Sequence, residues 1–210
     1  MRPIFLNLIL IFCSFKLRAQ DTTGIGEIKE QRNALINELK RYHDIDSIAK
    51  VIKPGVLDEQ AFAIAKSIDG SVDNLDSIVT LAFRNKYSEA AFLYYLWDLR
   101  FRYSVAADEN LKDDKTAGAL LASFEYEFGE ILYPFLHANF ENFDAVLKRS
   151  VDWFGKNDSK TDPQAKNPKA YQQQIENFNK MIVELEKNKE KYVEDWAEDE
   201  RKQKELTEDD

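Results

Sequence analysis

One stretch of the chain, EYEFGEILYPFLH at residues 125 to 137, places carboxylates and an imidazole close together. These groups can bind metal ions or transfer protons. If the stretch is helical, Glu127, Glu130, His137 and the later Glu141 fall on the side opposite its phenylalanines. A metal centre inside a helical bundle needs its Glu and His side chains on the core face. We therefore predict that these charged groups face solvent, with no metal and no catalytic residue there. The alternative is a surface metal site at His137 and Glu141.

A second polar group lies in the segment SEAAFLYYLWDLRFRYSVAA, residues 88 to 107. On a helix its large apolar side chains would point in almost every direction, which is typical of a central helix in a bundle. Tyr95, Asp98 and Arg102 share one face of this helix, so we expect their polar ends to be partly buried. Asp98 and Arg102 can neutralise each other in an internal network beside Tyr95. Alternatively, the three residues form a ligand-binding site in which Arg102 binds an anionic small molecule and Tyr95 orients it.

The other polar motifs predict no cofactor. His43, in YHDID, follows a predicted helix and is expected to interact with its negative end or with a neighbouring Asp. The run DGSVDNLDSIVT from Asp69 resembles a calcium loop, but Asn74 stands at the glycine position and Thr80 at the bidentate glutamate position. Turn and N-cap roles explain its Asp and Ser residues, with a calcium site as the alternative. The chain has no G-x-S-x-G motif for a nucleophilic serine.

The first residues, MRPIFLNLILIFCSFKLRAQ, combine a basic residue with a short apolar run. The run is too short to span a bilayer and predicts a signal peptide over residues 1–19, with a retained membrane anchor as the alternative. Its removal would take away Cys13, the single cysteine, so that no disulfide or thiolate ligand is expected. We expect an exported protein, periplasmic or secreted, of a bacterial envelope.

The charge of the chain also excludes some partners. Without the leader, 26 basic residues face 38 acidic ones, a formal charge of −12. Such a surface repels nucleic acid and anionic lipid, so that neither is an expected partner. The 44% hydrophobic and 12% aromatic content, however, predicts a folded domain with a full core.

Scarce glycine and proline and the absence of a strong alternating pattern predict an all-α protein. We expect an irregular multi-helix bundle over residues 20–155. A short helix in it should be capped by Asp46 and end at Pro54-Gly55, and a later one should start at Asp73 or Asn74. The other helices are predicted over residues 26–42, 57–68, 75–84, 88–107, 116–139 and 143–154.

Residues 156–169 form a polar segment with two prolines and predict a linker. Beyond it, residues 170–210 predict a single long helix that ends in a charged tail. Its apolar residues recur at the 3.5-residue period of a coiled-coil seam, at Tyr171, Ile175, Phe178, Ile182, Leu185, Lys189, Tyr192 and Trp196. Such a helix needs a partner, which is either the rest of the same chain or a second copy.

These patterns favour a non-enzymatic helical protein of the cell envelope that acts through protein–protein interaction. Its partner would be another protein, or a second copy, bound through the C-terminal helix. The alternative is a helical bundle that binds or converts an anionic small molecule around Asp98 and Arg102.

Overall fold

The fold is known from a computed structural model. It describes residues 45–71, 74–108, 115–158 and 167–208. These residues belong to one compact unit, His43–Asp210. Several predicted features lie outside the described residues: the signal peptide at 1–19, the helix at 26–42, His43, part of the calcium-like run at 72–73 and most of the linker, at 159–166.

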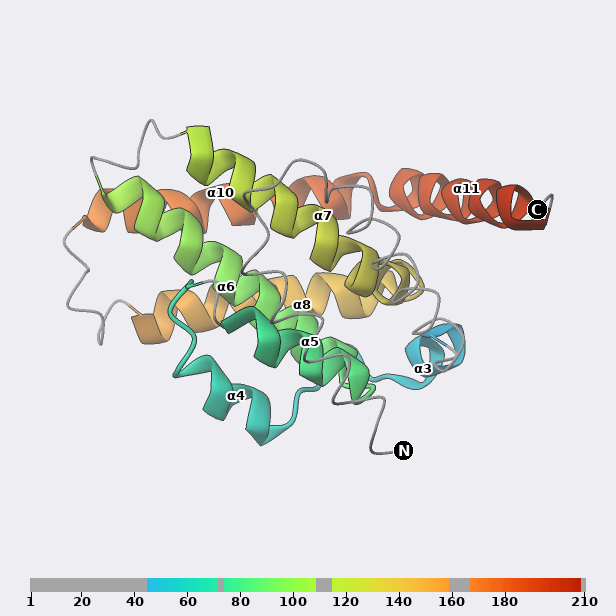
Figure 1. The fold of residues 1–210 in the computed structure, drawn as a ribbon, viewed down its shortest axis with the longest axis horizontal. Helices are drawn as coiled ribbons and strands as arrows, with labels where there is room; N and C mark the ends of the chain where they lie inside the picture. Colours follow the sequence, from blue (N-terminus) through green and yellow to red (C-terminus); the bar gives the residue numbers. More distant parts are fainter. Residues whose placement is uncertain (1–44, 72–73, 109–114, 159–166, 209–210) are drawn as a thin grey trace, which may run out of the picture. The chain divides into compact units, whose positions relative to one another are not determined.

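The described residues are helical and contain no strand, which confirms the all-α prediction for this part of the chain. Figure 1 shows the arrangement of the helices. In chain order they are α3 (Ile45–Val51), α4 (Glu59–Ala65), α5 (Leu75–Phe83), α6 (Tyr87–Ala107), α7 (Lys115–His137), α8 (Phe140–Trp153), the π-helical turn η3 (Phe154–Asp158), α10 (Pro168–Lys187) and α11 (Lys189–Glu208).

Helix α6 is the centre of the unit, as its apolar surface predicts. Every residue from Tyr87 to Leu99 is buried except Glu89, and the helix packs against α4, α5, α7, α8 and α10. Because all sides of α6 are covered, it needs no polar face along this length. Its aromatic side chains meet rings from other helices; Tyr94, for example, stacks on Phe128 of α7 at a centroid distance of 5.6 Å.

The connection between α4 and α5 lies directly on α6. Arg100 donates from Nη1 to the carbonyl oxygen of Ala65, at 2.7 Å, and to that of Ile68. Trp97 donates from Nε1 to the carbonyl oxygen of Ser71 at 2.9 Å. Between these anchors Gly70 has φ of +80° and approaches the α6 backbone closely. The end of α4 is thus capped by side chains of another helix, which no local sequence signal predicts.

Some predicted helix ends differ from the structure. Helix α4 begins only after Asp58, whose side chain accepts from the Ala61 amide at 3.2 Å as an N-cap. Helix α8 begins at Phe140, earlier than predicted, because the Asn139 side chain caps it. Asp46 lies inside the first turn of α3 and is therefore not its N-cap. The predicted N-cap at Asn74 of α5 is in place, although its side chain makes no capping hydrogen bond.

The C-terminal helix packs against its own chain. Asn167 caps α10, and the buried residues Gln174, Phe178 and Ile182 face α6 and α8. All eight predicted seam residues are buried or half-buried, so the predicted face of the helix is correct. The neighbours of α10 are helices of the same unit, and a coiled coil with a second chain stays a prediction.

The prediction of one unbroken C-terminal helix is wrong. Asn188, with φ of −108° and ψ of 21°, separates α10 from α11. Its amide still donates to the Glu184 carbonyl at 3.1 Å, and the Tyr192 amide donates to the Asn188 carbonyl at 3.0 Å. The first of these bonds closes the last turn of α10 and the second closes the first turn of α11, so the break is confined to Asn188. Neither glycine nor proline enforces it.

Candidate functional site

The structure places two residues of the candidate ligand site on α6, Asp98 and Arg102, in direct contact with each other. Asp98 is only 5% exposed, and Arg102 donates from Nε to Asp98 Oδ1 at 2.7 Å. The ring of Tyr95 is buried, with its centroid 5.2 Å from Tyr94 and 6.0 Å from Phe143. A buried carboxylate that binds a charged donor one turn away is what the internal-network interpretation expects. Binding of an anionic ligand by these three residues stays a prediction.

The pair gives a stability prediction. Arg102→Met keeps most of the aliphatic length of the side chain but removes its donor to Asp98. We expect the free energy of unfolding at neutral pH to fall by about 1–3 kcal/mol, because a buried carboxylate loses a charged hydrogen bond. Urea denaturation measures it. Arg84→Met, at an exposed position, is the matched control, and an equal effect of the two variants would contradict the network.

The structure corrects the interpretation of His137, which was predicted to face solvent. Its imidazole is half-buried and lies parallel to the Trp196 indole, with ring centroids 3.9 Å apart and planes 2° apart. Tyr133 stacks at a centroid distance of 5.4 Å from the same imidazole. His137 is thus partly covered by α11 instead of facing solvent. The side chains of Glu127 and Glu130 lie outside the described residues.

Trp196 is the centre of an aromatic cluster that joins three helices. Its ring centroid lies about 6 Å from those of Phe140 and Phe143 on α8 and of Tyr192 on α11. We call these residues, together with Tyr133 and His137 of α7, the Trp196 cluster. Stacked and tilted aromatic pairs each contribute about 0.5–1.5 kcal/mol beyond their burial, so this cluster is the main apolar contact of α11 among the described residues. Helices α8 and α10 lie between α7 and α11 in the sequence. The spacing of residues within any one helix therefore could not reveal the contact between α7 and α11.

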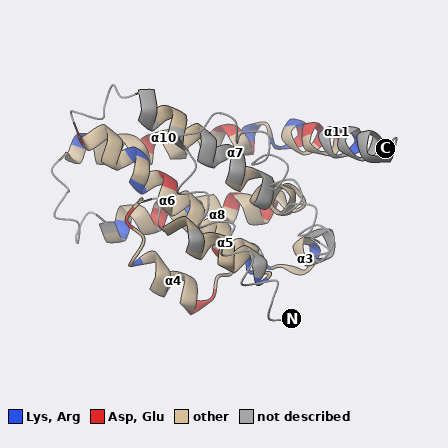
Figure 2. Cartoon of the chain, in the orientation of Figure 1, with Lys and Arg blue, Asp and Glu red and all other residues tan. Residues whose placement is uncertain are grey.

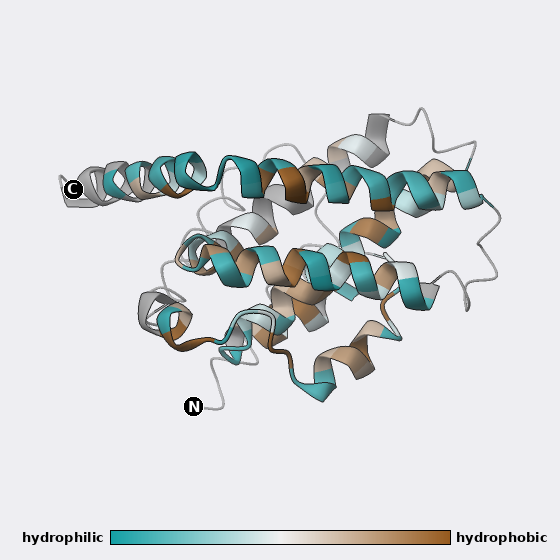
Figure 3. Ribbon diagram, turned by 180° about the vertical axis from the view of Figure 1, so that it is seen from behind, coloured by the Kyte–Doolittle hydropathy of each residue, from teal (hydrophilic) through white to brown (hydrophobic). Residues whose placement is uncertain are grey.

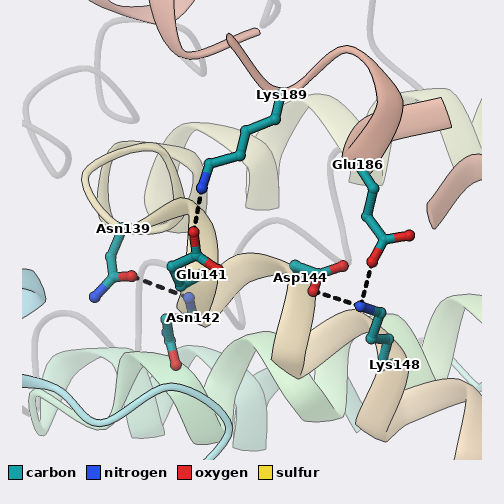
Figure 4. Close-up of polar contacts among 7 residues, drawn as sticks. All are labelled: Asn139, Glu141, Asn142, Asp144, Lys148, Glu186 and Lys189. Carbon is teal, nitrogen blue, oxygen red and sulfur yellow. Dashed lines mark hydrogen bonds and ion pairs between the residues drawn. The ribbon is translucent and has the colours of Figure 1, made fainter. Parts of the chain in front are cut away.

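A set of ion pairs lies beside the cluster, at the break between α10 and α11 (Figure 4). Helix α8 presents Glu141, Asp144 and Lys148 along one stripe, at steps of three and four residues. Lys189, just after the break, binds Glu141 and lies 5.2 Å from the Phe140 ring centroid. Lys148 binds Asp144 at 2.7 Å and reaches Glu186, just before the break, at 2.5 Å. We call these five charged residues the α8 clasp.

The clasp holds both sides of Asn188 to α8, but weakly. The hydrogen bond from Lys148 to Asp144, followed by that to Glu186, raises the pKa of the Lys148 amine above its ordinary value of 10.5. The Lys148 amine is therefore charged at neutral pH, and its contribution to the ion pair is lost as the pH rises through this raised pKa. Most of the clasp side chains are well exposed, and exposed pairs typically contribute only about 0–1 kcal/mol. We infer that Trp196, and not the clasp, provides most of the docking energy of α11.

This inference predicts the behaviour of Trp196→Ala. We expect the docked state of α11 to lose about 2 kcal/mol, because the variant removes every contact described above between an aromatic ring of α11 and a ring of α7 or α8. Trypsin reports this opening, since Lys187, Lys189 and Lys191 surround the break. Cleavage there should be about 30-fold faster in the variant. Val193→Ala, at a 40% exposed neighbour on α11, should change little. Equal cleavage of the two variants would show that Trp196 does not hold α11.

The described part of the chain holds no group of three His, Cys, Asp or Glu side chains placed to bind a metal ion. None of its helices has the length and apolar character needed to cross a membrane.

Comparison with known proteins gives no relative. No family model, no curated protein and no solved structure matches this chain.

Proposed function

We propose that this protein is an exported, non-enzymatic helical protein of the bacterial cell envelope that acts by binding another protein through α11. Export rests on the apolar run that precedes Ala19, with a mature chain that starts at Gln20. The acidic surface disfavours nucleic acid as the partner.

The single observation that carries the proposal is the difference between the two C-terminal helices. Helix α10 buries Gln174, Phe178 and Ile182 in the unit. Helix α11 contains no fully buried residue among its described side chains, and only Lys189, Tyr192 and Trp196 are half-buried. In Figure 1, α11 runs out past the ends of the neighbouring helices. A helix that contributes so little to the core of its own unit is free to contribute to binding.

The surface of α11 also suits a protein partner. Figure 2 shows both basic and acidic residues along it, and Figure 3 shows that the outer sides of α10 and α11 are mostly hydrophilic. Mixed charges with an apolar residue among them, such as Val193 at 40% exposure, resemble the polar rim and small apolar contacts of reversible protein interfaces.

A truncation tests the proposal. The chain of residues 20–188 keeps α10 and should fold, with a helical circular dichroism signal and cooperative unfolding. Crosslinking in the intact envelope, followed by purification, should recover a protein partner with residues 20–210 that is absent with residues 20–188. A partner recovered equally with both chains would place the binding surface elsewhere. Truncation before Tyr171 is not an equivalent test, because it also removes Phe178 and Ile182 from the core.

The alternative, an anionic-ligand site at Tyr95, Asp98 and Arg102, has less support. Arg102 already donates to the Asp98 carboxylate, so an anion would have to compete with an internal charge for the same guanidinium.

A further inference from the structure

The surface that holds α11 has one occupant whose fit is visible, which is α11 itself. Trp196 stacks on His137, and Lys189 binds Glu141 and covers the Phe140 ring. A second copy of the chain carries the same residues and offers the same surface. Any contact that α11 makes within its own chain could therefore be made equally well between two copies.

The break between α10 and α11 is confined to one residue, Asn188. Its amide closes the last turn of α10 by donating to Glu184, and its carbonyl accepts from Tyr192 in the first turn of α11. A change of the φ and ψ angles at this one residue would complete the helix. The sequence itself favours a continuous helix over residues 170–210, since its seam runs through the break without interruption. What favours the broken form is the docking of α11 on α7 and α8, by the Trp196 cluster and the α8 clasp.

We propose that α11 exchanges between two copies of the chain. Asn188 straightens, residues 168–208 form one helix of about 60 Å, and Trp196 and Lys189 of each copy bind His137 and Glu141 of the other. The exchanged dimer and the single chain make the same docking contacts. The equilibrium is then set by the peptide hydrogen bonds gained when the helix is completed at Asn188 against the entropy of association, and it depends on protein concentration. This inference rests on the proposed function, because it names a second copy as the partner of α11.

Crosslinking between two copies that carry cysteines at different positions tests the exchange. The mature chain has no cysteine, so Glu141→Cys and Lys189→Cys can be placed in two separate full-length mature chains. Loss of this exposed ion pair should affect docking little. After mixing at high concentration and treatment with a short bis-maleimide, we expect a covalent heterodimer of the two chains. The control for random collisions replaces the Glu141→Cys chain with a Ser67→Cys chain, whose cysteine is at an exposed site near α4. A yield no greater than that of this control would overturn the proposal.

Two more variants keep the test specific. Trp196→Ala in the Lys189→Cys chain should abolish the heterodimer, because the exchanged helix then has no docking residue. Asn188→Pro removes the amide that bonds to Glu184 and prevents a continuous helix, so it should also suppress the heterodimer while the chain stays folded. A heterodimer that persists in either variant would contradict exchange through Asn188.

The outcome is separable from that of the proposed function. A full-length chain that stays monomeric by sedimentation at every concentration, with no crosslink above the control, would overturn the exchange alone. Loss of an envelope partner on truncation after Asn188 would still support binding of another protein by α11. Recovery of the same partners with and without α11 would refute that function whatever the self-association.

Discussion

Phe178→Ala should lower the free energy of unfolding by about 3–5 kcal/mol. The ring lies on the inner face of α10, is 6% exposed and belongs to the interface that α10 forms with α6 and α8. Truncation to alanine removes its buried area and leaves a cavity in a helix interface that cannot fully collapse. Chemical denaturation of the mature chain, followed by far-ultraviolet circular dichroism, measures the loss.

Val183→Ala is the matched control for Phe178→Ala. It lies on the same helix but is 60% exposed, so its truncation should change the stability by only a few tenths of a kcal/mol. A small effect of Phe178→Ala, similar to that of Val183→Ala, would mean that α10 does not belong to the core. The seam would then be available to a second chain instead.

Gly70→Ala should destabilise the protein by about 2–4 kcal/mol. Gly70 has φ of +80°, which disfavours any residue with a Cβ atom. A Cβ atom there would also lie 2.8 Å from the Phe101 nitrogen and 2.9 Å from the Arg100 carbonyl carbon, both of the α6 backbone. Because backbone atoms of a central helix cannot move aside, the loop from α4 must shift and its hydrogen bonds with Trp97 and Arg100 must weaken.

Gly118→Ala is the control for this substitution, and its expected sign is opposite. Gly118 is an exposed residue within α7, and no atom lies within 4 Å of a Cβ atom placed there. Alanine should therefore stabilise the protein by about 0.5–1 kcal/mol through its better helix propensity. Thermal unfolding of both variants measures the difference, and destabilisation of equal size at the two sites would contradict the close approach of Gly70 to α6.

Local sequence patterns predicted which faces of α6 and α10 are buried. Helix α6 is apolar on all sides, and it is buried on all sides in the structure. The inner face of α10 was predicted from the spacing of Phe178 and Ile182, because a regular period fixes which side chains share a face. These features depend only on neighbours within one turn or two, which the sequence displays directly.

The parts that the sequence did not predict depend on residues far apart in the chain. The break at Asn188 has no glycine or proline to signal it, and the contacts beside it join Lys189 to Glu141 and Glu186 to Lys148. His137 was assigned to solvent because its own helix has an apolar stripe elsewhere, yet Trp196 covers it from α11. Periodicity orients a side chain on its own helix, but it does not say which other helix lies opposite.

The candidate site shows the same limit. The four-residue spacing of Asp98 and Arg102 predicted their pairing, which the structure shows at 2.7 Å. The spacing did not reveal that Tyr95 packs among aromatic rings, such as Phe143 of α8. The Trp196 cluster had only one sequence signal, the position of Tyr192 and Trp196 at the end of the C-terminal seam.

The central claim is that α10 is part of the core whereas α11 is a separable binding helix. Amide hydrogen exchange of the full mature chain measures this directly, because it gives an opening free energy for each helix. We expect amides in the middle of α10 to exchange only through global unfolding, and amides of α11 to exchange through a local opening of clearly lower free energy. Equal protection of the two helices, with both following global unfolding, would contradict the claim.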